Sequence, residues 1–199
     1  MENSNLVLRR SYMPLQVPLT TREEENGEKI IEGYFVVYNQ ITNLWGDIFE
    51  KVAPGAGDKS LKENDIRCLY NHNSDIPLGR MSAKTAEFFS DEKGIFGRVK
   101  INPNDQEAND IYERVKRGDI TGCSYGYWPI KETYEETEDG TIWTVEEANI
   151  IEMSICTFPQ YDQTEITARA AEYTREKGQA LSRRKKIAND KLKGVKEKC

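Results

Sequence analysis

Short runs of branched and aromatic residues, each closed by turn-forming residues, recur through most of this chain. The first three are "IIEGYFVVYNQ" (30–40), "WGDIFEKVAPGAG" (45–57) and "IRCLY" (66–70), and two longer ones are "DITGCSYGYWPIKETYEE" (119–136) and "GTIWTVEEANIIEMSICTFP" (140–159). Branched and aromatic side chains suit the pleated surface of a sheet, whereas Gly, Pro, Asn and Asp suit turns. We therefore expect a chain built mainly from β-strands.

The sequence also predicts a hairpin and a single helix between these strand-like runs. "GRMSAKTAEFFSDEKGIFGRVKI" (79–101) has a turn at residues 91–94 between two strand-like runs, which predicts a hairpin. Residues 105–117 predict a helix that Gly118 ends, because apolar side chains recur at helical spacing at Ala108, Ile111, Tyr112 and Val115. Many short strands with one firm helix predict a barrel or a closed sandwich.

The net charge of −6 is spread unevenly over the 199 residues. Residues 170–199 hold ten Lys and Arg against four Asp and Glu, which leaves 18 basic and 30 acidic residues in the rest of the chain. A basic tail on an acidic body suits nucleic acid, an acidic partner or the inside of an assembly, and a solvated, partly helical terminus is the plainer interpretation. No apolar run approaches the roughly 18 residues that cross a bilayer, and residues 1–18 lack the order of a secretory signal, so we expect a soluble intracellular protein.

The four cysteines form no CxxC pair and lie far apart, at Cys68, Cys123, Cys156 and Cys199. Three of them are inside strand-like runs, where a free thiol behaves as a small hydrophobic side chain. This favours a reducing compartment over a disulfide framework. With one histidine in the whole chain, a structural zinc site is not expected either.

The only histidine, His72, follows the strand-like run 66–70 and precedes the turn formers at 73–75. An exposed loop histidine is the ordinary interpretation of such a position. A histidine at a strand end is also suited to general base catalysis when a nucleophile and an orienting group lie near it.

Serines in strand-like runs supply candidate nucleophiles. Ser124 is the better one, because Gly122 and Gly126 beside it let a substrate backbone approach and expose amide groups for an oxyanion. Ser154, with apolar neighbours, has the character of a buried strand residue. A different hydrolase that uses Ser154 or Cys123 as its nucleophile remains an alternative.

Glu152 interrupts the apolar run "NIIEMSICTF". A carboxylate in such a run needs a partner, and an imidazole N–H would serve while fixing the tautomer of the ring. Because Glu152 and Ser154 share one face of a strand, a solvent-facing residue is the competing interpretation. From these residues alone, a catalytic set of Ser, His and Glu is one interpretation among several.

Taken together, these segments resemble the tailed-phage prohead protease family, which comprises capsid maturation serine proteases related in fold to the herpesvirus assemblins. The segments that carry the resemblance are "EGYFVVYNQ", "DIFEKVAPGA", "RCLYNHNSDIPLGR", "VKRGDITGCSYGYWP" and "IIEMSICTFPQYDQTEITAR". They run in order from about residue 33 to residue 169, and the third is similar to the block that carries the family's catalytic histidine. The fourth is similar to "RGDISGMSFGF", which carries the nucleophilic serine.

The resemblance implies a β-rich α+β fold, an assemblin-like β-barrel with surrounding helices. It implies that His72 is the general base, Ser124 the nucleophile and Glu152 the third member, with no cofactor and no metal. The family's commoner "NHD" is "NHN" here, so an acid after the histidine is missing and Glu152 has to suffice.

The resemblance also implies a biological setting, which is the host or prophage-bearing bacterial cytoplasm, inside the procapsid. The substrates would be the major capsid protein or the scaffold protein, and often the protease itself. A homodimer is implied by the herpesvirus relatives, while a membrane and a specific nucleic acid are not expected as partners. The alternative is a non-enzymatic scaffold or structural β-barrel protein of the virion.

The composition and the resemblance together divide the chain into three parts. We expect a polar N-terminal extension at 1–28, the prohead protease domain at 29–169 and a basic, helical tail at 170–199. The tail is interpreted as a docking or self-processed segment because its charge differs from that of the body.

Overall fold

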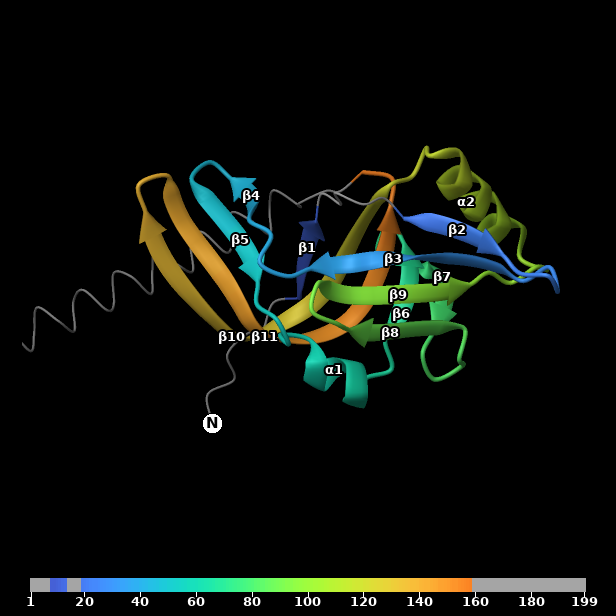
Figure 1. Cartoon of the computed structure of the whole chain (residues 1–199), viewed down its shortest axis with the longest axis horizontal. Helices are drawn as coiled ribbons and strands as arrows, with labels where there is room; N and C mark the ends of the chain where they lie inside the picture. Colours follow the sequence, from blue (N-terminus) through green and yellow to red (C-terminus); the bar gives the residue numbers. More distant parts are fainter. Residues whose placement is uncertain (1–7, 14–18, 159–199) are drawn as a thin grey trace, which may run out of the picture. The chain divides into compact units, whose positions relative to one another are not determined.

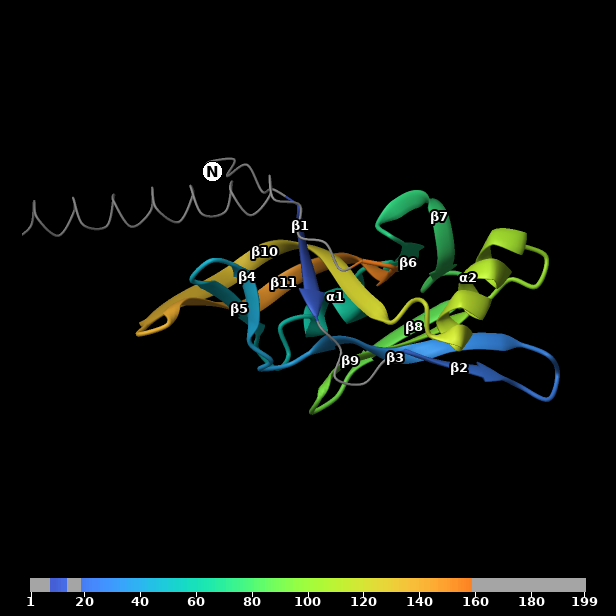
Figure 2. The same cartoon turned by 90° about the horizontal axis from the view of Figure 1, so that it is seen from above.

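The computed structural model describes residues 8–13 and 19–158, and the tail expected at 170–199 lies outside the described residues. Two open β-sheets make up most of this part, and Figure 2 shows them as two layers. Neither described helix is long and apolar enough to span a bilayer. The expectation of a β-rich α+β fold is therefore confirmed.

The larger sheet has seven strands and is organised around the long hairpin β10–β11 (Figure 1). Its strands are β1 (Arg9–Met13), β10 (Gly122–Thr137), β11 (Gly140–Cys156), β5 (Ile48–Val52), β4 (Thr42–Trp45), β6 (Arg67–Tyr70) and β7 (Asn73–Arg80). The first part of β11 pairs in parallel with β5, and its last part pairs in parallel with β6. The end of β6 is thereby held beside the end of β11.

The smaller sheet has four strands in the order β2-β3-β9-β8. These are β2 (Thr20–Glu23), β3 (Lys29–Val37), β9 (Gly94–Lys100) and β8 (Ala86–Ser90). The hairpin expected within residues 79–101 is confirmed for β8 and β9, and Asp91 binds the amides of Lys93 and Gly94 in its turn.

Two short helices accompany the sheets. The expected helix is α2 (Gln106–Arg117), where the carboxylate of Asp105 accepts from the amide of Ala108 and Gly118 ends the helix in the left-handed conformation at φ 90°. Its apolar side chains are buried, as their spacing predicts. The second helix, α1 (Asp58–Glu63), was not predicted, because six residues are too few to show a helical period.

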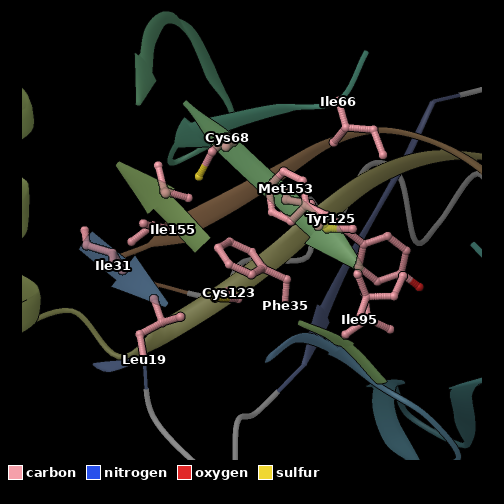
Figure 3. Close-up of a cluster of buried hydrophobic side chains, with 14 of the residues drawn as sticks. Leu19, Ile31, Phe35, Ile66, Cys68, Ile95, Cys123, Tyr125, Met153 and Ile155 are labelled. Atoms are coloured by element: carbon pink, nitrogen blue, oxygen red, sulfur yellow. The ribbon is translucent and has the colours of Figure 1, made fainter. Parts of the chain in front are cut away.

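The hydrophobic core lies between the two sheets (Figure 3). Cys123 and Tyr125 of β10 and Met153 and Ile155 of β11 contribute to it from the larger sheet. Because side chains alternate along a strand, the residues between these positions face the other side of the sheet. The face of the larger sheet that is turned away from this core carries Ser124, Gly126, Glu152 and Ser154, which are nevertheless buried.

Two features of the described part differ from the sequence-based expectations. The predicted closure of the strands into a barrel is not confirmed, because both sheets of the described part are open and no closed barrel forms there. Strands β1 and β2 also come from the segment 1–28, whose polar composition gave no strand signal. β1 obtains its order from pairing with β10, a contact with residues more than a hundred positions away.

Candidate active site

His72 lies in a two-residue turn between β6 and β7, whose flanking residues Tyr70 and Asn73 are paired. Asn71 and His72 both have positive φ, 50° and 58°. Positive φ at both central residues is what a type I′ hairpin turn requires, and asparagine and histidine are among the non-glycine residues that tolerate it best. The strand end predicted at His72 is therefore a tight turn, which fixes the direction of the imidazole.

The turn is tied to the end of β11 by several hydrogen bonds. The amide of Asn71 donates to the carbonyl of Ile155 at 2.9 Å, and the amide of Thr157 donates to the Asn71 side-chain oxygen at 2.9 Å. The hydroxyls of Tyr70 and Thr157 are 2.5 Å apart. These contacts hold the histidine turn against the strand that carries Glu152.

The carboxylate of Glu152 binds the imidazole of His72. Its Oε1 is 2.5 Å from Nδ1 of His72, and its Oε2 accepts a hydrogen bond of 2.6 Å from the hydroxyl of Ser154. Glu152 is buried, at 8% exposure, so the carboxylate is satisfied by partners within the protein and not by bulk water. The solvent-facing interpretation of Glu152 is therefore wrong, and the contact expected between a carboxylate and the imidazole is present.

The remaining ring nitrogen of His72, Nε2, is buried and has no hydrogen-bond partner among the residues that the structure describes. With Nδ1 engaged by a carboxylate, Nε2 is the nitrogen left to exchange a proton with another group. Buried polar atoms without partners are uncommon, so this atom marks a place where a further group is expected to bind or react.

Ser124 lies next to this pair, on the neighbouring strand. In the register of β10 and β11, Ser124 is directly opposite Ser154 and Gly126 is directly opposite Glu152. Directly opposed residues share one face of a sheet, with Cβ atoms about 4.5–5.5 Å apart. Ser124 is 1% exposed, so a substrate reaches its hydroxyl only after covering groups move.

Gly126 makes room for the carboxylate. A methyl group on its Cα would lie 3.0 Å from both Cγ and Cδ of Glu152 and closer still to Oε1, the oxygen that binds His72. The sequence-based interpretation of Gly126 was that it allows a substrate to approach. The structure gives Gly126 another role, because its missing side chain leaves the space that the side chain of Glu152 occupies beside β10.

The main chain around Ser124 is engaged on both edges of β10. Met13 of β1 is opposite Cys123 and Arg10 is opposite Gly126, while β11 pairs with the other edge. A strand between two antiparallel neighbours uses its N–H groups in the two ladders. The amides from Cys123 to Gly126 are therefore engaged in the two ladders in this arrangement.

The described cysteines are poor nucleophiles. Cys68, Cys123 and Cys156 are buried free thiols. Burial raises the pKa of Cys123 well above its usual range, and burial together with the charge of Glu152 raises the pKa of Cys156 to about 12. A thiol that stays protonated at neutral pH does not attack a carbonyl, so the alternative that uses Cys123 is not supported.

Metal ligands do not gather in the described residues, where no group of three or more His, Cys, Asp and Glu side chains is arranged to hold an ion. What these residues do bring together is a histidine held by a buried carboxylate, with a serine one strand away. Serine hydrolases use these three residue types, with the carboxylate on the histidine and the histidine acting on the serine.

Comparison with known proteins gives the family. Residues 17–178 match the family described as caudovirus prohead serine protease. A prohead protease of Enterobacteria phage HK97 is 31% identical over 142 residues, which cover 70% of this chain and 59% of that protein, so the chain spans less than two thirds of that relative's length. No solved structure matches the chain significantly. The chain belongs to the caudovirus prohead serine protease family.

The role of one residue near the His72–Glu152 pair was missed in the sequence. The prediction that Ser154 is a buried strand residue is confirmed, at 0% exposure. Its contacts with Glu152 and His72 were not predicted. The signal that could have found it is its position two residues after Glu152, on the same face of one strand.

Proposed function

We propose that this chain is a serine endopeptidase that cleaves capsid-protein or scaffold segments during maturation of a phage procapsid. The observation that carries the proposal is the buried Glu152–His72 pair beside Ser124, in a chain of the prohead serine protease family. The relative from phage HK97 is named a prohead protease, which supports the same activity here.

In the proposed mechanism, Ser124 attacks a peptide carbonyl and forms an acyl-enzyme. Nε2 of His72 takes the serine proton and returns it to the leaving amine, and a water then hydrolyses the ester by the same route. Glu152 holds Nδ1 and stabilises the charged ring. Because the amides from Cys123 to Gly126 are engaged in the ladders, the oxyanion donors come from another segment or become free when β1 leaves β10.

The biological setting is proposed from the family. The enzyme acts inside the procapsid in the bacterial cytoplasm, with the major capsid protein or scaffold protein as partner and itself as a further substrate. Three further predictions come from the resemblance and the composition. They are a homodimer, a relation of the two open sheets to the assemblin barrel, and the division of the chain into 1–28, 29–169 and 170–199. Normal packaging and processing after deletion of residues 170–199 would remove the docking role of the tail.

The proposal is tested by intact mass of the purified chain over time, beside Ser124→Ala and His72→Ala. We expect defined fragments from the wild type alone, because each variant lacks one of the two groups that exchange the proton. The new termini then give the cleavage preference.

Because Ser124 is buried, the purified chain alone is not a sufficient test of activity. The chain is therefore also co-expressed with the capsid protein of its phage, and processing of that protein is measured. Processing that requires Ser124 and His72 supports the proposal. Processing that survives Ser124→Ala favours another nucleophile, and virion assembly that depends on the chain but on neither residue favours the structural-protein alternative.

A further inference from the structure

The hydroxyl of Ser154 closes a ring of hydrogen bonds around the His72–Glu152 pair. It donates to Oε2 of Glu152 at 2.6 Å and accepts from the backbone amide of His72 at 3.2 Å. The other oxygen of Glu152 is 2.5 Å from the ring of the same histidine. One hydroxyl therefore contacts both the carboxylate and the main chain that carries the imidazole.

Each of these contacts limits a different motion. The bond to Oε2 stops the carboxylate from rotating about its last torsion, which otherwise has a broad minimum. The bond from the amide of His72 holds a residue whose positive φ of 58° is unfavourable for a side chain larger than glycine. The ring and its partner are thus fixed relative to each other by a third residue.

We propose that Ser154 is a positioning residue of the active site, which holds Glu152 and the His72 turn so that the imidazole keeps one orientation, with Nδ1 on Glu152 and Nε2 left to exchange a proton. This inference rests on the proposed function for its catalytic meaning. Its geometric content, that the imidazole is oriented through Ser154, does not depend on peptidase activity.

The alternative role of Ser154, that of nucleophile, does not fit its contacts. Its proton is directed to Oε2 of Glu152, and its contact with His72 is to the backbone amide and not to the imidazole. A nucleophilic serine needs its proton directed to a base that can later release it to a leaving group, which in this site is the imidazole.

The test uses the fact that the chain has a single histidine, so every imidazole signal in an NMR spectrum belongs to His72. In the wild type we expect a far-downfield Nδ1–H proton, protected from exchange by Glu152. In Ser154→Ala we expect this signal to broaden or to move upfield. We also expect labelling of Ser124 by a serine-directed phosphonate to slow by on the order of 10- to 100-fold, because small displacements of a catalytic group are costly.

Ser60→Ala is the matched control. Ser60 is also a buried serine that binds β11, donating to the carbonyl of Ala148 at 2.7 Å and accepting from the amide of Ile150 at 2.9 Å. The Ser60→Ala variant loses a buried hydroxyl of the same kind, but Ser60 has no described contact with His72. We expect it to leave the imidazole signals and the labelling rate unchanged.

Ser154→Thr keeps the hydroxyl, and we expect its signals and labelling rate to return toward the wild type. If Ser154→Ala does not fold, Ser154→Cys replaces it, because a thiol has a similar shape and is a weak donor. Imidazole signals that are the same in wild type, Ser154→Ala and Ser154→Cys overturn the inference. A wild type that carries the downfield signal, together with capsid-protein processing that survives Ser124→Ala, counts against the proposed function and not against the positioning by Ser154.

Discussion

At the scale of single residues, the site depends on a glycine as much as on its polar groups. Gly126 faces Glu152 across β10 and β11, and its missing side chain is the space through which the carboxylate reaches His72. A glycine inside a strand weakens the strand, and such a residue often marks a close approach of another group. Here the approaching group is the carboxylate of the proposed triad.

Gly126→Ala is therefore expected to disturb the site more than its size suggests. The new methyl group meets Cγ and Cδ of Glu152 at 3.0 Å, so the carboxylate has to move away from Nδ1 of His72. We expect a loss of stability of about 1–3 kcal/mol, a loss of processing on the order of 10- to 100-fold, and an altered Nδ1–H signal. Urea unfolding, processing by mass spectrometry and NMR measure the three effects.

The matched control for this variant is Gly97→Ala in β9. Its methyl group comes within 2.7 Å of the rings of Phe35 and Phe88, so it crowds the core and not the site. We expect Gly97→Ala to lower stability without changing the His72 signals. A Gly126→Ala variant with an unchanged imidazole would contradict the spatial role of Gly126.

At the scale of elements, the histidine turn is one end of the β6–β7 hairpin, and Asp65 fastens the other end. Its carboxylate accepts from Nε of Arg80 at 2.5 Å and from the amide of Ser82 at 3.0 Å. These hydrogen bonds, led by the one from Arg80, hold the pKa of Asp65 well below its ordinary value of 3.8. The hairpin is thus closed at its base by charge and at its tip by the turn.

Asp65→Asn is expected to lower the folding stability at neutral pH. It is also expected to make the stability depend less on pH in the acid range. Because the folded-state pKa is lowered, the contribution of this carboxylate is fully present above the unfolded pKa and is lost as the pH falls through the lower folded pKa. The gap in melting temperature between wild type and variant should therefore be largest near pH 7 and shrink below about pH 4. Thermal unfolding at several pH values measures this gap.

Asp75→Asn, which removes an exposed carboxylate from β7, is the control for this series. It is expected to follow the wild type across the pH range. A gap for Asp65→Asn that stays constant with pH would show that the loss comes from packing and not from the charge of Asp65.

Local signals in the sequence were enough for some elements and not for others. The helix α2 was predicted because its apolar spacing is regular and Gly118 ends it. The strand β1 was not predicted, because a strand at the edge of a sheet with polar composition has no local signal, and its order depends on β10. The turn at Asn71 and His72 was predicted as a loop, but its tightness depends on its contacts with β11.

At the scale of the whole described unit, the two sheets are joined by one core. Phe35 of β3 is completely buried and packs edge to face on Phe88 of β8, with ring centres 5.4 Å apart and planes at 87°. Both rings belong to the smaller sheet and to the cluster that also includes Tyr125 and Met153 of the larger sheet. The stability of the site strands is therefore coupled to that of the opposite layer.

Phe35→Ala is expected to cost about 3–5 kcal/mol of unfolding free energy, because it leaves a cavity in this shared core. Phe89→Ala, which truncates the neighbour of Phe88 on the other face of β8, is the comparison. Phe89 is 37% exposed, so its loss should be clearly smaller. Urea denaturation measures both, and equal losses would argue against a single core between the sheets.

The sequence by itself determined the strand-rich character of the chain, the helix α2 with its end at Gly118, and the candidates His72, Ser124 and Glu152. These follow from residue types within a few positions of one another and from blocks that resemble a known family. Only the tertiary structure decided that the sheets are open, that β6 lies in parallel beside β11, and that Ser154 and Gly126 lie against Glu152. His72 and Glu152 are 80 residues apart, and their contact is set by the packing of whole strands, which local residue preferences do not specify.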